Sequence, residues 1–258
     1  MLLYAVPLTT EVAAMKTETI RKLQEMKLGV MADAYMKQAE HPDIYAPMGF
    51  DDRLAVIVDY AHDAWENSNI AGRIRRAKFP ESGISFSDIR FLPDRHLDAE
   101  LMRSLCTNAY IRKNWNVIFL GATGTGKSFL ATVLGIEACK DGVRVRYLRL
   151  PEFFSEYAAA EAAHKEIAYL KFLLKVPLLI VDDFLLFPAN EEQQRVILEL
   201  AESRNGRAST IFCSQFDIEG WHANLGGGVV ADSVLDRIKA KAYVIELKGD
   251  SMRSRLKD

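Results

Sequence analysis

A short apolar segment that leads into a glycine-rich loop is the feature that most limits what this chain can fold into. The run Asn116–Leu120 is typical of a buried strand, and it is followed at once by Gly121-Ala-Thr-Gly-Thr-Gly-Lys-Ser128, which matches G-x-x-x-x-G-K-S. A helical pattern then extends from Phe129 to Lys140. This order of strand, loop and helix is that of the phosphate-binding P-loop. A chance glycine turn with a lysine is the alternative, and the flanking strand and helix argue against it.

The residues of this loop predict how a nucleotide binds. Glycines leave room for consecutive backbone N–H groups to point into one concave site, and the helix N-terminus adds partial positive charge. We expect Lys127 to reach the β- and γ-phosphates and the Ser128 hydroxyl to ligate Mg²⁺. The predicted phosphate-binding residues are Gly121, Ala122, Thr123, Gly124, Thr125, Gly126, Lys127 and Ser128.

Two carboxylates follow a second apolar segment, Leu178–Val181. A strand of this kind would deliver Asp182 and Asp183 to the edge of the sheet beside the P-loop. In nucleotide hydrolases with this arrangement the first acid holds Mg²⁺, directly or through water, and the second polarises the attacking water. A strand followed by a solvated Asp-Asp turn is the alternative. The position downstream of a P-loop, with a strand and a helix between, favours the catalytic interpretation.

Three further polar residues are candidates for contact with the phosphates. Ser214 and Gln215 end a third apolar segment and are placed to touch the γ-phosphate or to orient water; a strand end capped by polar side chains is the other interpretation. Arg237 lies on a predicted helix after Gly226-Gly-Gly228, and its planar, permanent charge suits a transferring phosphate. A surface Asp-Arg pair explains the same residues equally well.

Composition excludes several classes of protein. The chain has 258 residues and a net charge of about −2, so no global field draws it onto nucleic acid and any such contact must be local. No apolar stretch approaches the roughly 18 to 20 residues of a membrane span, and the first residues make a poor secretion signal. Three isolated cysteines indicate a reducing compartment, and we expect a soluble cytoplasmic protein. The three cysteines are Cys106, Cys139 and Cys213.

The hydrophobic pattern divides the chain into a helical part and an α/β part. We expect a loose extension over residues 1–14, a helical N-terminal region over 15–80 that binds DNA or a partner, a linker over 81–93 and an ATPase domain over 94–258. Helices are predicted at 94–112, 127–140, 152–175 and 191–205, the last with Asn190 as N-cap and Gln193 three residues on.

Strands and helices alternate from Trp115 onward. The strands have continuous apolar runs, which indicates burial on both faces and hence a parallel sheet covered by helices. The fold class is therefore a three-layer α/β domain preceded by a small helical domain. The predicted strands are 116–120, 143–148, 178–181, 210–214 and 243–247.

Together these motifs resemble a known family, the IstB-type transposition helper ATPases of bacterial insertion sequences, which are relatives of the DnaC-type helicase loaders within the AAA+ class. The resemblance covers about residues 16 to 257. In the second half it is carried by Gly121–Ser128, Leu178–Asp183, Ser214-Gln215, Ala231–Arg237 and Ile245–Arg253. In the first half it is carried by Leu23–Gln38, Phe50–Ala55 and Asn69–Pro80.

The resemblance implies a fold, ligands and partners. The fold would be a P-loop AAA+ domain with a five-stranded sheet of order 5-1-4-3-2. The ligands would be ATP and Mg²⁺, and the partners double-stranded DNA, a cognate transposase and further copies of the chain in an ATP-dependent oligomer. Arg237 would be the finger that acts on a neighbouring subunit, and Arg253 the sensor arginine.

Two residues depart from the pattern of the class. The water-activating position commonly holds glutamate, and here Asp183 is one methylene shorter. The first sensor position is often asparagine, and here it is Gln215. Both changes leave nucleotide binding intact and favour a slow, switch-like ATPase.

The densest basic cluster of the sequence is our candidate for the DNA contact. It consists of Arg73, Arg75, Arg76 and Lys78. Phosphate contacts need only local positive charge, and no set of residues suggests base reading, so we expect little sequence preference. Cations at a helix C-terminus are the alternative explanation, since the helix dipole favours them there.

Two other functions fit parts of the sequence. A replicative helicase loader would share the motifs and use ATP to control release of its partner. A small-molecule P-loop kinase would need an arginine-rich lid and an acceptor pocket, and the sequence shows neither.

Overall fold

The computed structural model describes residues 8–252 and 254, and it divides into two compact units at Ala71 and Gly72. Arg253, the predicted sensor arginine, lies outside the described residues. The boundary between the units falls within one long helix, and each unit is described by itself.

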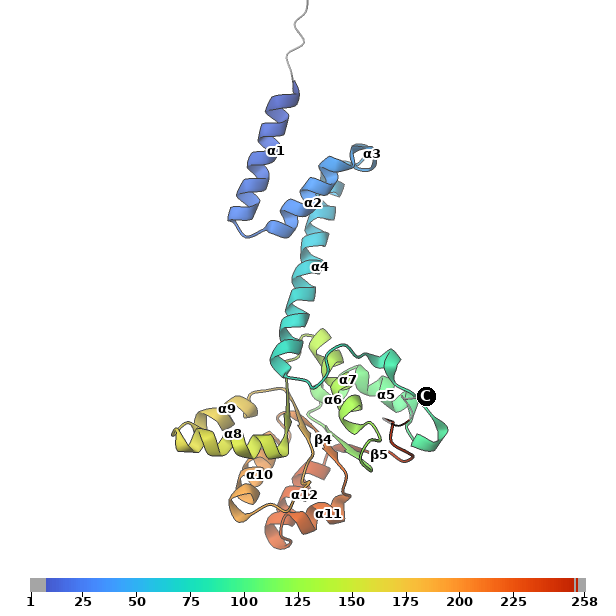
Figure 1. Ribbon diagram of the computed structural model, residues 1–258, viewed down its shortest axis with the longest axis vertical. Helices are drawn as coiled ribbons and strands as arrows, with labels where there is room; N and C mark the ends of the chain where they lie inside the picture. Colours follow the sequence, from blue (N-terminus) through green and yellow to red (C-terminus); the bar gives the residue numbers. More distant parts are fainter. Residues whose placement is uncertain (1–7, 253, 255–258) are drawn as a thin grey trace, which may run out of the picture. The chain divides into compact units, whose positions relative to one another are not determined.

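The first unit consists of helices. They are α1 (Leu8–Glu25), α2 (Gly29–Glu40), α3 (Pro42–Tyr45) and the greater part of α4 (Phe50–Ala77) (Figure 1). The first helix begins at Leu8, so residues 8–14 are helical where we expected a loose extension. Helices α1 and α2 are separated by a short turn: Lys27 has a positive φ of 62°, and α2 begins two residues later at Gly29.

The second unit is built on a parallel sheet of five strands. These are β1 (Asn116–Leu120), β2 (Val145–Arg149), β3 (Leu178–Asp182), β4 (Ser209–Ser214) and β5 (Ala242–Glu246). Their order is β2-β3-β4-β1-β5, which is the predicted order, and all the pairs are parallel. The carboxyl ends of β1, β3 and β4 therefore meet at one edge of the sheet, where the P-loop and the two aspartates lie.

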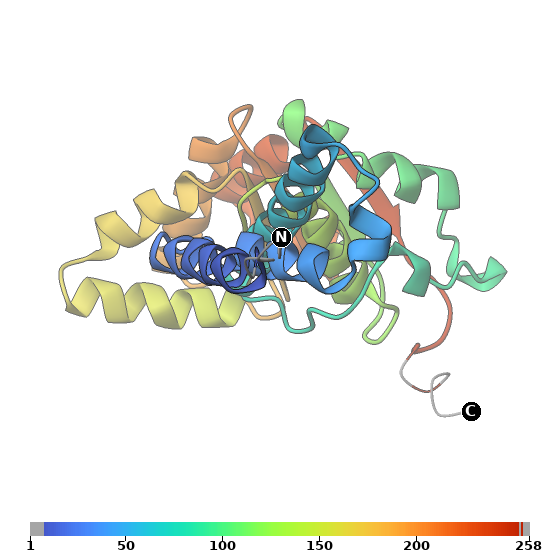
Figure 2. The same cartoon turned by 90° about the horizontal axis from the view of Figure 1, so that it is seen from above.

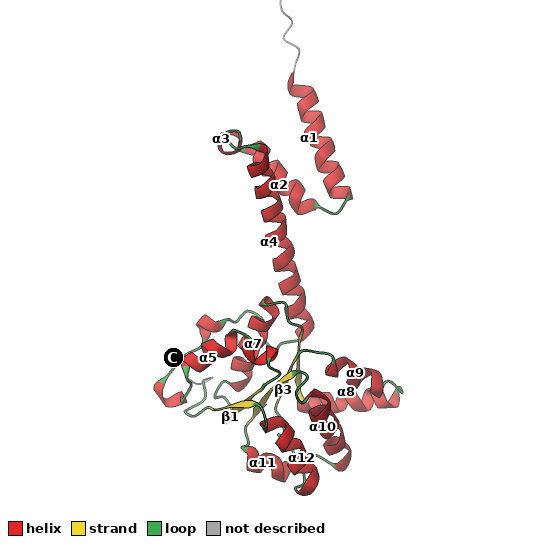
Figure 3. Cartoon of the chain, turned by 180° about the vertical axis from the view of Figure 1, so that it is seen from behind, coloured by secondary structure: helices red, strands yellow, loops and turns green. Residues whose placement is uncertain are grey.

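Alternate residues of each strand build two separate hydrophobic layers. Val117 and Phe119 of β1 pack into one cluster, while Ile118 and Leu120 pack into the other. The first cluster is covered by α5 (Ala99–Cys106), α6 (Ala109–Arg112) and α7 (Lys127–Lys140). The second is covered by α8 (Leu150–Ala162), α9 (Glu166–Leu174), α10 (Glu191–Arg204), α11 (Ile218–Asn224) and α12 (Gly228–Lys239), and Figure 3 shows α10 to α12 on the far side of the sheet from α5 and α7.

Two predicted helices are each broken in the structure. The helix expected over 152–175 is the hairpin of α8 and α9, because His164 adopts a left-handed φ of 55° (Figure 2). The helix expected over 94–112 divides in the same way at Asn108, whose φ is 58°. Before it the chain forms two short 3-10 helices, η1 (Phe86–Asp88) and η2 (Pro93–Arg95).

Helix capping follows the sequence where the predicted polar residues are present. The side chain of Asn190 accepts from the backbone N–H of Gln193 at 2.9 Å, and the Gln193 side chain accepts from the backbone N–H of Asn190 at 3.0 Å. This reciprocal pair is a capping box and fixes the start of α10.

Candidate nucleotide-binding site

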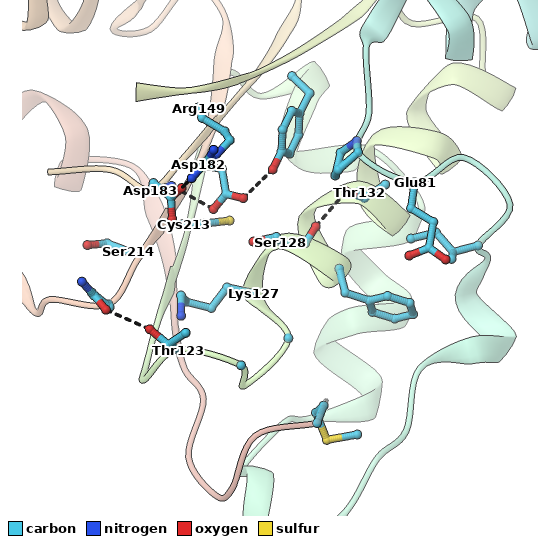
Figure 4. Close-up of a pocket in the computed structure, with 18 of the residues that line it drawn as sticks. Glu81, Thr123, Lys127, Ser128, Thr132, Arg149, Asp182, Asp183, Cys213 and Ser214 are labelled. Atoms are coloured by element: carbon cyan, nitrogen blue, oxygen red, sulfur yellow. Dashed lines mark hydrogen bonds and ion pairs between the residues drawn. The ribbon is translucent and has the colours of Figure 1, made fainter. Parts of the chain in front are cut away.

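The P-loop opens into a cavity of about 1160 Å³ within the second unit (Figure 4). Its walls come from the P-loop, from the carboxyl ends of β2, β3 and β4, and from the segment around η1 and η2. The motifs that are far apart in the sequence therefore meet at one site, as the parallel topology requires.

The glycines of the loop are needed because other segments approach their backbone closely. A Cβ atom on Gly124 would overlap the Ser251 side chain, and one on Gly126 would lie 2.9 Å from Nη2 of Arg95. Both glycines also have positive φ angles, of 86° and 96°. The backbone N–H of Met252 donates to the carbonyl of Gly124 at 2.8 Å, so the chain after β5 braces the loop.

Lys127 begins α7 and lines the cavity. Its ammonium group donates to the carbonyls of Gly121 and Ala122, at 2.7 and 2.8 Å. Burial lowers the pKa of Lys127, because a charged group loses hydration there. The lysine is thus held against its own loop, at the place where phosphates would compete with the carbonyls.

Two threonines tie the rest of the loop together. The buried Thr125 donates from its hydroxyl to the carbonyl of Ala122 at 2.8 Å. Thr123 donates to the side-chain oxygen of Gln215 at 2.9 Å, which links the loop to the end of β4.

The cavity contains the oxygen groups that a magnesium nucleotide requires. Ser128 and Asp182 line it together, and hydroxyl and carboxylate oxygens are preferred ligands of Mg²⁺. The carboxylate of Asp182 is only 5% exposed; one oxygen accepts from the backbone N–H of Asp183 at 2.9 Å, and the other accepts from the hydroxyl of Tyr147. The residues present therefore fit Mg²⁺ bound together with phosphates.

Asp183, the predicted water-activating residue, also lines the cavity but is held by an arginine. Arg149, at the end of β2, donates from Nε to Oδ2 of Asp183 at 2.8 Å and forms an ion pair with it at 2.6 Å. Asp183 adopts a left-handed φ of 50°, which is uncommon for residues other than glycine and is best tolerated by Asp and Asn.

Ser214 and Gln215 occupy different roles at the end of β4. The Ser214 hydroxyl is 1% exposed and donates to the carbonyl of Phe184 at 2.8 Å, while it accepts from the N–H of Phe216 at 3.2 Å. Because its hydroxyl bonds to two main-chain groups, Ser214 stabilises the backbone at the end of β4. Gln215 is exposed and in contact with the P-loop through Thr123.

Arg237 is not among the residues that line its own chain's nucleotide cavity. It lies on α12, where it forms an ion pair with Glu202 at 2.8 Å and donates to the carbonyl of Ser233 at 2.8 Å. The predicted basic cluster is also away from the cavity, since Arg73 donates to the carbonyl of Cys139 at 2.7 Å, near the end of α7. The other members, Arg75, Arg76 and Lys78, are exposed.

Three residues of the site belong to no sequence motif, and the sequence did not predict them. Arg95 is 3% exposed and donates to the P-loop carbonyl of Thr125 at 2.9 Å. Tyr147 and Arg149 come from β2, where they reach Asp182 at the end of the neighbouring strand β3 and Asp183 directly after it. The available signal was the alternation of β2, because parallel pairing with β3 places residues 147 and 149 beside 180 and 182.

Comparison with known proteins identifies the family to which the chain is similar. The family model of the IstB-like ATP-binding protein matches residues 21–258. The protein y4uH of Sinorhizobium fredii, an insertion sequence ATP-binding protein by its name, is 35% identical over 239 residues, which are 93% of this chain and 96% of that protein. The protein y4pL of the same organism, with the same description, is 33% identical and covers 91% and 95% of the two chains.

Solved structures show the same fold at lower identity. The structure of DnaA from Aquifex aeolicus bound to AMPPCP is similar with a TM-score of 0.58, 19% identity, and coverage of 69% of this chain and 54% of that one. The crystal structure of DnaI gives a TM-score of 0.52, 22% identity, and coverage of 66% and 90%. The predicted α/β fold, with its five-stranded parallel sheet, is therefore confirmed. In the described part of the chain, no helix is long and apolar enough to cross a membrane.

Proposed function

Because this chain belongs to the family of IstB-like ATP-binding proteins of insertion sequences, we propose that it is an ATP-driven DNA-assembly factor that assists a transposase. In this proposal the chain binds ATP with Mg²⁺, assembles on duplex DNA in several copies, and hydrolyses ATP slowly to end the assembled state.

The single observation that supports ATP chemistry best is the meeting of the P-loop, Asp182 and Asp183 in one cavity. The loop N–H groups and Lys127 would hold the phosphates, and Ser128 with Asp182 would hold Mg²⁺. Bound Mg²⁺ would neutralise charge that develops on the phosphates. Asp183 would accept a proton from the attacking water once its carboxylate is released from Arg149.

The location of Arg237 supports a role between subunits. Arg237 does not line the nucleotide cavity of its own chain, and its side chain is partly exposed. It would therefore contact the γ-phosphate of ATP bound to a neighbouring subunit. Gln215 would act within the same chain, where it already contacts the loop.

The exposed cations at the end of α4 support DNA binding. Within the described residues, the exposed side chains of Arg75, Arg76 and Lys78 form no hydrogen bond or ion pair, whereas Arg73 donates to the carbonyl of Cys139 at the end of α7. Contacts of this kind read the phosphate backbone and give little sequence preference. The names of the relatives place them in insertion sequences, and a transposase is the partner that such a context favours.

Light scattering tests this proposal directly. The mass of the protein is measured alone, with a non-hydrolysable ATP analogue, and with the analogue plus duplex DNA. We expect large assemblies only in the third condition, and Lys127→Ala should abolish them together with nucleotide binding. Lys140→Ala is the matched control, because Lys140 ends the same helix and pairs with Glu137 in solvent. Unchanged assembly by Lys127→Ala would contradict the ATP switch.

A replicative helicase loader remains a second candidate, because the fold is shared with DnaI and with the DnaC helicase loader. The two functions differ in their partner. Affinity capture with purified hexameric helicase and with purified transposase separates them. Retention of the transposase alone supports the assembly factor, and retention of the helicase alone supports the loader.

A further inference from the structure

Tyr147 lies one strand away from the carboxylate that is expected to hold Mg²⁺. It is the middle residue of β2 and is paired in register with Ile180 of β3. Its hydroxyl donates to Oδ2 of Asp182, while Oδ1 of Asp182 accepts from the backbone N–H of Asp183 at 2.9 Å. Each carboxylate oxygen has two lone pairs, so these two bonds fix its direction and still leave lone pairs for a metal ion.

The phenol is suited to act as a permanent donor. Tyr147 is 7% exposed, so its phenol is largely shielded from water. An ionised carboxylate has no proton to donate, so the hydrogen bond runs from the tyrosine hydroxyl to Asp182.

Packing fixes the ring that carries this hydroxyl. Phe79 meets Tyr147 edge to face, with ring centroids 6.4 Å apart and an interplanar angle of 66°. Phe79 in turn lies against Gly135 of α7, where a Cβ atom would come within 2.6 Å of its ring. Phe79, itself packed on Gly135 of α7, thus holds the Tyr147 ring and its hydroxyl in one place.

We propose that Tyr147 is a positioning residue for the magnesium site, which holds the Asp182 carboxylate in the orientation that binds the ion. The inference rests on the proposed function, because it concerns the metal ligand of that function. Neither the P-loop nor the Asp-Asp pair contains any sign of it.

The expected size of the effect follows from metal sites in general. Residues that hydrogen-bond a metal ligand typically change metal affinity by about 10- to 100-fold when they are removed. Tyr147→Phe removes one oxygen atom and keeps the ring that packs on Phe79. Tyr147 also lines the cavity, but its hydroxyl bonds to Asp182 and not to the P-loop, so we expect only the dependence on Mg²⁺ to change.

Calorimetry with a non-hydrolysable ATP analogue measures this without any turnover. The full-length protein is titrated with the analogue at a series of Mg²⁺ concentrations and also in EDTA. For Tyr147→Phe we expect the Mg²⁺ concentration that gives half the full enhancement to rise at least tenfold, with affinity in EDTA unchanged. An unchanged Mg²⁺ midpoint would overturn the proposal, and an equal loss in EDTA would show a merely structural role.

Tyr169→Phe is the matched control. The Tyr169 hydroxyl donates to Glu156 at 2.7 Å, and the residue is not among those that line the nucleotide cavity. The Tyr169→Phe variant also loses a phenol oxygen and its hydrogen bond to a carboxylate. Its Mg²⁺ midpoint should equal that of the unaltered protein. A shift as large as that of Tyr147→Phe would also contradict the proposal.

A second variant covers the case in which Tyr147→Phe does not fold. Phe79→Leu keeps the hydroxyl but loosens the ring that supports it, so it should raise the Mg²⁺ midpoint in the same direction by a smaller factor. No shift in a folded Phe79→Leu protein would then count against the proposal. If the unaltered protein binds no nucleotide at all, the proposed function itself fails, which is a different result.

Discussion

The two units of this chain differ in how much apolar surface they bury by themselves. In the second unit Trp221, Phe119 and Phe153 are at most 1% exposed. In the first unit, among the side chains described from residue 17 to 71, only Ala32 and Ala34 are buried. Large apolar side chains on α4 remain in solvent, including Phe50 at 69% and Trp65 at 64% exposure.

The difference teaches that regular secondary structure and a self-sufficient core are separate properties. Burial of apolar area is the main source of folding free energy, so the second unit is stable on its own side chains. The first unit has the helical pattern of a buried element without the burial. Its helices satisfy their backbone hydrogen bonds, while its large apolar side chains stay exposed.

The largest expected effect tests whether the second unit is self-sufficient for chemistry as well. Arg237→Ala should leave the affinity for ATP unchanged and lower hydrolysis by about 10³-fold or more, because an arginine supplied between subunits contributes that much in other nucleotide hydrolases. Hydrolysis is measured by phosphate release in the presence of duplex DNA.

Glu202→Gln is the control for the ion pair that Arg237 forms within its own chain. If loss of that pair explained the defect, both variants would be equally slow. Normal hydrolysis by Arg237→Ala would exclude the finger.

Substitution of one tryptophan in each unit compares how much each side chain contributes to the free energy of unfolding. Trp221→Ala should lower the free energy of unfolding by about 3–5 kcal/mol, because a fully buried aromatic side chain leaves a cavity. Trp65→Ala should change it by about 0.5 kcal/mol or less, as exposed positions do. Urea unfolding followed by circular dichroism gives both values, and a large loss for Trp65→Ala would show that the first unit has a core after all.

A pair of glycines tests the close packing of the P-loop. Gly124→Ala should weaken binding of an ATP analogue by about tenfold, since overpacking against Ser251 costs about 1–3 kcal/mol and displaces the loop. Gly142→Ala is matched in backbone angle, with φ of 83° against 86°, but has nothing within 4 Å of the added Cβ. Its nucleotide affinity should be unchanged, and equal losses in the two variants would refute the role of Ser251.

The smallest expected effect concerns the exposed pair of Arg149 and Asp183. Arg149→Ala should raise DNA-free hydrolysis by at most about fivefold, because exposed ion pairs contribute about 0.2–1 kcal/mol. Glu152→Gln removes the other partner of Arg149 and should have no such effect. A fall in the rate of Arg149→Ala would mean that the arginine assists hydrolysis instead of restraining its base.

Much of the nucleotide site could be predicted because its signals are local. Gly121–Ser128 and Asp182 belong to motifs in which the chemistry and the backbone are set by neighbours in the sequence. The capping box of Asn190 and Gln193 is local in the same way. The order of the strands came from the family resemblance, and the parallel pairing agrees with it.

The remainder depends on long-range packing or on single backbone angles. Tyr147 and Arg149 acquire their partners only when β2 pairs with β3, so the alternation of residues 145–149 does not by itself identify those partners. The break at His164 comes from one left-handed residue that is not glycine. The hydroxyl of Ser214 was a candidate for the phosphates, and the fold gives it a main-chain carbonyl as partner.

The left-handed turn at Asp183 also explains why aspartate stands where many related ATPases have glutamate. A short side chain tolerates that backbone angle better than a long one does, so lengthening the base would oppose the conformation that presents it. If Asp183 activates water as proposed, the rate of hydrolysis would therefore depend on the backbone conformation directly after β3. A variant with glutamate in place of Asp183 would need a different backbone conformation directly after β3.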